Sequence, residues 1–213
     1  LLPVATTWFA WHEVLTLGNT HNAWYPYVIA FFAFSFIDYW MHRLLHASKF
    51  LWRHIHSLHH DTPVMNVLVF SYLHPFDVFL RVGASNCILL FVLGLTPTQI
   101  ATAVMPIIII GGIQHSNIRC PKWLDYVIMT PRMHKEHHRK NYNTSNFGVI
   151  ALWDQLFRTV RYPVKAATEF GFETFSAKHT LSSLLLFRSF IKSKKTHKKI
   201  PGVKPAEPEY SLD

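Results

Sequence analysis

The sequence VFLRVGASNCILLFVL at residues 78–93 is followed, after the uncharged turn GLTPTQ at 94–99, by IATAVMPIIIIGGI at 100–113. Each apolar stretch approaches the roughly 17 to 25 residues that a membrane-spanning helix needs. Two such stretches joined by a short Gly/Pro turn predict a transmembrane helical hairpin. Because a hairpin returns the chain to its starting side, we expect the segments before Val78 and after Ile113 to share one face.

A third apolar stretch, WYPYVIAFFAFSFIDYW at 24–40, precedes the hairpin. A fourth, at 2–17, carries His12 and Glu13 and is either a truncated span or an interfacial helix. The fold prediction is an all-α integral membrane bundle of about four spans, including the hairpin at 78–113.

The composition agrees with this class. The chain has 213 residues, of which 50% are hydrophobic and 15% charged, so a disordered or fibrous protein is excluded. Cys87 and Cys120 do not build a disulfide framework and are expected to be free thiols in a reducing compartment.

The net charge of +9 is concentrated near the end of the chain. Seven lysines and arginines and no acid lie between Arg188 and Lys204, after an apolar stretch at 181–191. This amphipathic, basic tail favours an anionic lipid surface over a solvated tail. No nucleic acid is expected as a partner, because no basic face is interleaved with stacking aromatics.

Basic residues also flank the hairpin, whereas its turn is uncharged. By the positive-inside rule the flanking face is cytoplasmic, in a bacterial inner membrane or endoplasmic reticulum. These residues are Arg43, Lys49 and Arg53 before the hairpin and Arg119, Lys122, Arg132, Lys135, Arg139 and Lys140 after it.

Three clusters account for eight of the 15 histidines, and all lie on this face: HRLLH at 42–46, HSLHH at 56–60 and HKEHH at 134–138. Spacings of three and four place side chains on one face of a helix. Each cluster is therefore expected to offer two or three imidazoles to a common point. We predict metal ligation by His42, His46, His56, His59, His60, His134, His137 and His138.

Eight imidazoles exceed the needs of one structural zinc, so two metals are indicated. Imidazole alone does not choose between iron, copper, nickel and zinc. Redox chemistry on lipid would need iron or copper, whereas zinc would favour hydrolysis. Glu136, inside the third cluster, is the one carboxylate placed to act as a base there.

The wider context of these clusters resembles the fatty acid hydroxylase and sterol desaturase superfamily of membrane di-iron oxygenases. The supporting segments are DYWMHRLLH at 38–46, LWRHIHSLHH at 51–60, MNVL at 65–68, HP at 74–75, QHSNIRCP at 114–121, TPRMHKEHH at 130–138, and SNFG with LWDQLFRT at 145–159. The resemblance covers about residues 34–159 and is specific for the superfamily rather than for a substrate.

The resemblance implies a cytosolic helical cap, rich in histidine, over the membrane bundle. It adds His115 as a ninth ligand and His74 as a tentative one. His54 is left out because it lies off the face of its cluster, and His12, His21, His179 and His197 are expected to be ordinary surface residues. Carboxylates expected to orient the ligating histidines are Asp38, Asp61, Asp125, Asp154 and Glu136.

The family pattern is not followed everywhere. Arg158 stands where glycine is usual, Tyr72 where arginine often precedes the HP pair, and Asp61 where serine is common. None of these positions is an expected ligand, so the departures bear on subfamily and substrate rather than on the metal site.

The implied function is O2-dependent C–H oxidation of a lipid, such as a fatty acyl chain, sterol or carotenoid, by two iron ions. Hydroxylation is favoured, and desaturation and a non-catalytic membrane metal-binding protein stay open. Electrons must come from a cytochrome b5-like, ferredoxin or reductase partner, because the sequence has no dinucleotide fingerprint, CxxC or haem-attachment motif. The expected parts are N-terminal membrane or interfacial segments at 1–33, the catalytic domain at 34–162 and the tail at 163–213.

Overall fold

The computed structural model describes residues 23–140, 142, 144–172 and 185. The predicted helix at 2–17, the basic tail at 188–204 and four of the histidines expected to be ordinary lie outside the described residues. Those four are His12, His21, His179 and His197.

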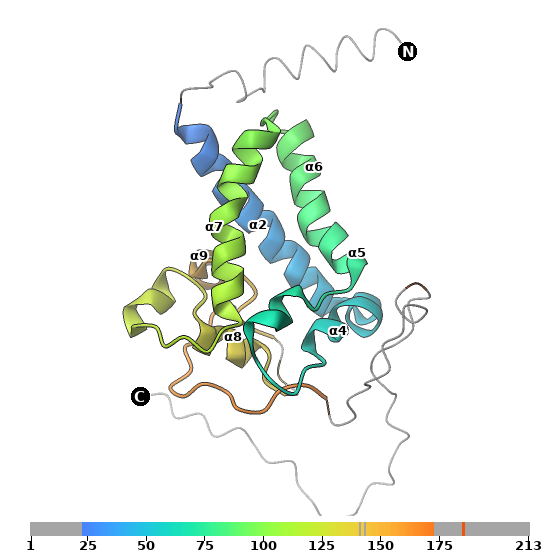
Figure 1. The fold of residues 1–213 in the computed structure, drawn as a ribbon, viewed down its shortest axis with the longest axis vertical. Helices are drawn as coiled ribbons and strands as arrows, with labels where there is room; N and C mark the ends of the chain where they lie inside the picture. Colours follow the sequence, from blue (N-terminus) through green and yellow to red (C-terminus); the bar gives the residue numbers. More distant parts are fainter. Residues whose placement is uncertain (1–22, 141, 143, 173–184, 186–213) are drawn as a thin grey trace, which may run out of the picture.

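Three long helical segments stand side by side and form the upper part of the molecule (Figure 1). They are α2 (Tyr25–Ala47), α7 (Pro97–Gln114), and a run made of α5 (Pro75–Val78), the π-helix η4 (Phe79–Gly83) and α6 (Ala84–Phe91). Their core consists of aliphatic and aromatic side chains, among them Ala30, Phe34, Leu89, Val104 and Ile107. A helical hairpin is thus formed by α5–η4–α6 and α7 at the predicted position, and its crossing of a membrane stays a prediction.

The start of α7 is specified locally. Pro97 occupies its first turn, and Thr96 and Gln99 form a reciprocal capping box. These bonds satisfy backbone N–H groups that would otherwise be unpaired where the hairpin turns.

The outward-facing surface of these helices is apolar. Along α2 every fourth side chain from position 28 to 44 is 37% to 47% exposed: Val28, Phe32, Phe36, Trp40 and Leu44. Among the described residues, α2 and α7 are long and apolar enough to cross a membrane. The mostly helical fold is confirmed, and this apolar outer surface suggests a membrane protein. Four spans remain a prediction.

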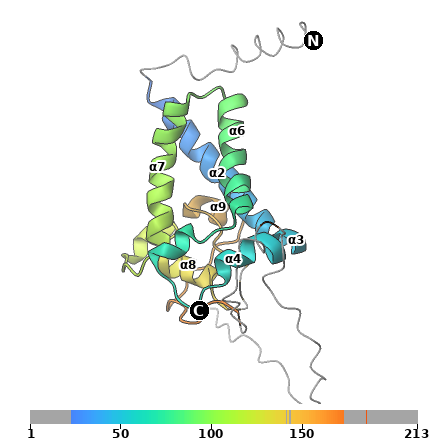
Figure 2. The same cartoon turned by 45° about the vertical axis from the view of Figure 1, so that its right-hand side comes forward.

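Short elements gather at the lower end of the long helices (Figures 1 and 2). They are α3 (Lys49–Leu51), η2 (Trp52–His56), α4 (Ser57–His60), η3 (Val67–Ser71), η5 (Lys122–Tyr126), α8 (Pro131–His137) and α9 (Ala151–Leu156). In the described part of the chain there is no strand, only the isolated bridges Ile128–Ile150 and Arg139–Phe170. All three histidine clusters lie at this end, and its cytosolic placement stays a prediction.

The LWDQLFRT segment forms α9 and packs against α2. The Trp153 indole N–H donates to Ser35 Oγ at 3.0 Å, and the Tyr39 hydroxyl lies 3.0 Å from Thr159 Oγ1. The rings of Tyr39 and Phe157 stack with centroids 5.5 Å apart. These contacts fix the chain around 145–159 beside the histidines at the end of α2.

Arg158, the next-to-last residue of this segment, has a φ of 57°. This left-handed conformation costs a non-glycine residue about 1–2 kcal/mol. Glycine adopts this conformation without steric cost, which accounts for the glycine that the resemblance leads us to expect at this position.

We expect Arg158→Gly to stabilise the protein, because glycine adopts positive φ without steric cost. After the greater entropy of glycine in the unfolded chain is subtracted, a gain of about 0.5–1 kcal/mol remains, or on the order of 2 °C in Tm. Thermal unfolding of the detergent-solubilised protein measures this. Lys165→Gly, at a residue without positive φ, is the control and should not raise Tm; an equal rise in both variants would contradict the explanation.

Candidate metal centre

Nine histidines form two groups at the lower end of the helical bundle. In each group one side-chain nitrogen per residue lies within 4.8 Å of the others. The first group is His42, His46, His56, His60 and His137, and the second is His59, His115, His134 and His138. Each group could hold a metal ion, and neither contains a carboxylate among the described residues.

The two groups cut across the sequence clusters. His42 and His46 stay together, but HSLHH sends His59 to the second group and HKEHH sends His137 to the first. Each cluster thus offers two imidazoles to one group, as expected, and two of the three clusters send their remaining histidine to the other group. Neighbouring residues on a helix point about 100° apart, so adjacent histidines face different centres.

Hydrogen bonds at Nδ1 set the tautomer of several of these rings. His42 donates from Nδ1 to Phe147 O and His137 to Ser145 O, both at 2.7 Å. His115 donates to Gly111 O at 2.8 Å and His59 to Tyr72 O at 3.2 Å. Since a carbonyl oxygen only accepts, each Nδ1 carries the hydrogen and each neutral ring presents an Nε2 lone pair.

These Nε2 atoms nevertheless face one another at short range. His42 and His56 approach to 3.0 Å, and His59 and His115 to 3.2 Å. Two lone pairs at this distance repel unless a cation lies between them. Imidazole nitrogens bound at about 2.0–2.1 Å to one ion would lie about 3.0–3.4 Å apart, so the observed spacing fits metal coordination.

A proton is a poor alternative cation here because the rings are buried. Burial lowers the pKa of His137 to about 3 and that of His115 to about 4. Burial, and then the charge of His115, also lowers the pKa of His59. These imidazoles are neutral at pH 7, which is the form that binds metals.

The SNFG segment supplies two of the carbonyls and is itself held by Asp154. That carboxylate accepts hydrogen bonds from Phe147 N at 2.9 Å, Gly148 N at 2.7 Å and Thr159 Oγ1 at 2.6 Å. Asp154 therefore reaches His42 through the backbone of Phe147 rather than by direct contact.

The other predicted carboxylates have different partners. Asp38 pairs with Arg81, Asp125 with Arg132 and Thr130, and Glu136 with Arg139. Asp61 is buried, with 1% of its surface exposed. In the described contacts Asp38, Asp125 and Glu136 are bonded to no histidine of the two groups. The orienting role of all four carboxylates stays a prediction.

His74 lies outside both groups. Its Nδ1 accepts a hydrogen bond from Phe76 N at 3.0 Å and caps α5. His54 is also outside the groups, and its ring lies 4.9 Å from that of Phe50. The structure thus brings together nine of the ten predicted ligands.

Sequence reasoning missed Asp77, which is fully buried and lies 2.5 Å from His56 Nδ1. This contact bonds the Asp77 carboxylate directly to a grouped histidine. The signal was present in HPFD, where a carboxylate follows the HP pair by two residues.

Comparison with known proteins settles the family. The family model for fatty acid hydroxylase matches residues 27–159. The chain belongs to the fatty acid hydroxylase family. The resemblance inferred from the histidine clusters is thereby confirmed.

Several curated relatives of this chain are named as lipid enzymes. An ornithine lipid hydroxylase of Rhizobium tropici is 31% identical over 79% of this chain and 51% of its own length. A very-long-chain aldehyde decarbonylase of Oryza sativa is 28% identical over 70% and 60%, and sphinganine C4-monooxygenase 2 of Arabidopsis thaliana is 26% identical over 70% and 59%. The chain thus spans 51% to 60% of the length of these relatives. No solved structure gives a significant match.

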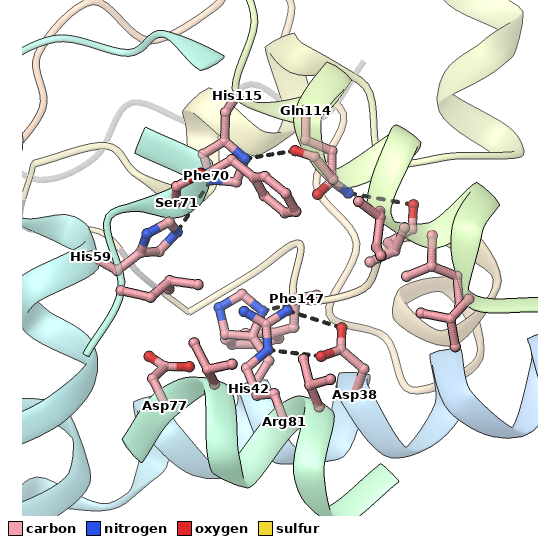
Figure 3. Close-up of a pocket in the computed structure, with 18 of the residues that line it drawn as sticks. Asp38, His42, His59, Phe70, Ser71, Asp77, Arg81, Gln114, His115 and Phe147 are labelled. Atoms are coloured by element: carbon pink, nitrogen blue, oxygen red, sulfur yellow. Dashed lines mark hydrogen bonds and ion pairs between the residues drawn. The ribbon is translucent and has the colours of Figure 1, made fainter. Parts of the chain in front are cut away.

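A cavity of about 330 Å³ connects the two histidine groups of this family member to its apolar helices. Figure 3 shows His42 on one side and His59 and His115 on the other. Much of the remaining wall is aliphatic, contributed by Val78, Val82, Val104, Ile107 and Ile108. Val78, Val82 and Ile108 are also 40% to 48% exposed on the outer surface. The cavity therefore lies directly behind the apolar outer surface of the helices.

One ion pair interrupts this apolar wall (Figure 3). Arg81 donates from Nε to Asp38 Oδ1 at 2.7 Å and from Nη2 to Asp38 Oδ2 at 2.9 Å. Asp38 lies one turn before His42 on α2, and Arg81 lies one turn after Asp77. This ion pair therefore connects α2 to η4. It lies beside a second connection, which runs from His42 through His56 to Asp77.

We expect Asp77→Asn to weaken metal binding by 10- to 100-fold, because an acceptor that orients a metal-bound imidazole has an effect of about this size. Metal content after dialysis against graded chelator, measured by mass spectrometry, gives the affinity. Glu169→Gln is the matched control, since Glu169 is exposed and its carboxylate belongs to neither histidine group. Equal retention by Asp77→Asn and wild type would contradict the assignment.

We expect Arg81→Met to destabilise the protein by about 3–5 kcal/mol, on the order of 10 °C in Tm, because the buried Asp38 carboxylate loses its cation. Thermal unfolding measures the loss. Adding Asp38→Asn to the same chain removes the stranded charge and should recover most of the stability. A double variant no more stable than Arg81→Met would show that the cost arises from packing instead.

Proposed function

We propose that this chain is a membrane oxygenase that holds two iron ions and uses O2 to hydroxylate a C–H bond of a lipid. The observation that carries the proposal is the pair of all-imidazole groups on an apolar cavity beside membrane-type helices. An all-imidazole donor set with redox-active metal suits oxygenation better than hydrolysis, which would call for a carboxylate base at the metals.

The relatives support a lipid substrate. Their names specify an ornithine lipid, sphinganine and, in Nicotiana tabacum, a Δ7-sterol. These compounds share long or fused apolar frameworks with few polar groups. The aliphatic wall formed by Val78, Val82 and Ile108 is suited to such a framework.

We assign the ligands as His42, His46, His56, His60 and His137 for one ion and His59, His115, His134 and His138 for the other. When bound, two irons would supply the dioxygen activation that an unactivated C–H bond requires. The chain would orient the imidazoles through the carbonyls of Ser145, Phe147 and Gly111 and through Asp77. Its apolar wall would exclude water and hold the lipid against the histidines.

Electrons would come from a separate carrier of the cytochrome b5, ferredoxin or reductase type, because the sequence carries no redox motif of its own. The histidine end would face the cytoplasm, where basic residues concentrate.

The experiment is lipid mass spectrometry on membranes from cells grown under ¹⁸O2 that express either wild type or His137→Ala. We expect an ¹⁸O-labelled lipid with the wild type and its loss with His137→Ala, together with loss of bound iron from about two ions per chain. His137 is chosen because its Nε2 is buried without a hydrogen-bond partner in the described structure, as a metal ligand's would be before metal is added.

His54→Ala is the matched control, since His54 neighbours the second cluster but belongs to neither group. It should retain both iron and product. An unlabelled product lighter by two hydrogens would replace hydroxylation with desaturation. Bound zinc with no O2 consumption would overturn the oxygenase proposal in favour of a metal-binding protein.

A further inference from the structure

A second concave site is lined by residues between α7 and α8 and by α8 itself, and no histidine of the two groups lines it. It is a groove of about 510 Å³ that four cations line: Arg119, Lys122, Arg132 and Lys135. No carboxylate lines it in the described part of the chain. We call these four residues the basic groove.

Only part of this charge is neutralised. The Arg132 guanidinium binds the Asp125 carboxylate, which also accepts from Thr130 Oγ1 at 2.5 Å. Lys135 donates to the neutral Asn117 Oδ1 at 2.7 Å. Among the described residues no carboxylate pairs with Arg119, Lys122 or Lys135, so the groove has a net positive charge.

Large apolar side chains alternate with these cations along the same segment. Ile118, Trp123, Tyr126 and Val127 are 54% to 64% exposed. Trp and Tyr next to Lys and Arg are characteristic of the boundary between the hydrocarbon and the headgroups of a bilayer. A surface in contact with water alone would not expose so much apolar area beside its charges.

The position of the segment agrees with such a boundary. The segment that carries η5 projects sideways from the lower end of α7, a candidate membrane helix (Figure 1). It is held in place by α9 and by the chain that follows α9. Gln155 Nε2 donates to Tyr126 O at 3.1 Å, and the rings of Tyr126 and Tyr162 lie 5.0 Å apart. The groove is therefore formed before any ligand binds.

We infer that the basic groove binds the phosphate headgroup of an anionic phospholipid of the surrounding bilayer, while Trp123 and its apolar neighbours insert beside the acyl chains. Arg119 and Lys122 would contact the phosphate, and Lys135 would line the inner side of the groove. This lipid is distinct from the substrate, because the groove and the cavity share no lining residue. An acidic protein is the competing occupant, but the exposed Trp123 and Ile118 favour lipid.

The test uses the full chain in nanodiscs of equal phosphatidylglycerol and phosphatidylcholine, followed by native mass spectrometry of the lipids it retains. Wild type should retain phosphatidylglycerol preferentially. Each lysine or arginine near an anionic surface raises affinity on the order of fivefold, so Arg119→Gln/Lys122→Gln should reduce this preference about 25-fold. Bound metal should be unchanged, which separates this result from failure of the proposed oxygenase function.

Lys49→Gln/Arg53→Gln is the matched control, because it removes the same charge from exposed residues outside the groove. It should keep the preference for phosphatidylglycerol. Unchanged phosphatidylglycerol retention in Arg119→Gln/Lys122→Gln would overturn the inference. If that variant instead lost turnover with a protein electron donor, the groove would be assigned to the donor.

A second measurement addresses insertion directly. The contribution of Trp123 is the difference in fluorescence between wild type and Trp123→Phe. Brominated phosphatidylglycerol should quench this difference more strongly than brominated phosphatidylcholine does. Because the chain has 7 tryptophans, this difference isolates Trp123. Equal quenching by the two lipids would refute selective binding beside Trp123.

Discussion

The contact between facing imidazole nitrogens is the constraint on which the rest of the structure depends. Nε2 atoms of His42 and His56, and of His59 and His115, lie 3.0 and 3.2 Å apart with their lone pairs directed at each other. Such contacts are unfavourable without a cation, and burial makes a proton costly. The fold therefore holds in place two sets of donors, each of which could bind a metal ion.

The surrounding elements hold these histidines in place in successive layers. Backbone carbonyls of Gly111, Ser145 and Phe147 fix the rings, and Asp154 and the packing of α9 on α2 fix the loop that carries two of those carbonyls. Long apolar helices lie above the histidines and enclose the cavity. Chemistry on a hydrophobic substrate at a membrane boundary is consistent with every layer.

The lower end of the molecule also has an interfacial surface of its own. The basic groove and the exposed aromatics of η5 lie on the segment between α7 and α8 and on α8 itself, which also carries His134 and His137. The proposed lipid contact and these histidines therefore lie on one continuous stretch of chain.

The sequence by itself determined the helical class, the family, the apolar hairpin and all nine histidines of the two groups. Eight of these histidines follow from spacing and residue type, which are local properties, and His115 follows from the resemblance. Only the tertiary structure decided which histidines meet: His59 and His60 are neighbours in sequence yet face different centres, since their directions depend on helix rotation and packing. It also supplied Asp77 as the partner of His56, Arg81 as the partner of Asp38, and the carbonyls that orient the rings. These partners lie 21, 43 and 105 residues apart in the chain, and separations of that size leave no periodic signal to read.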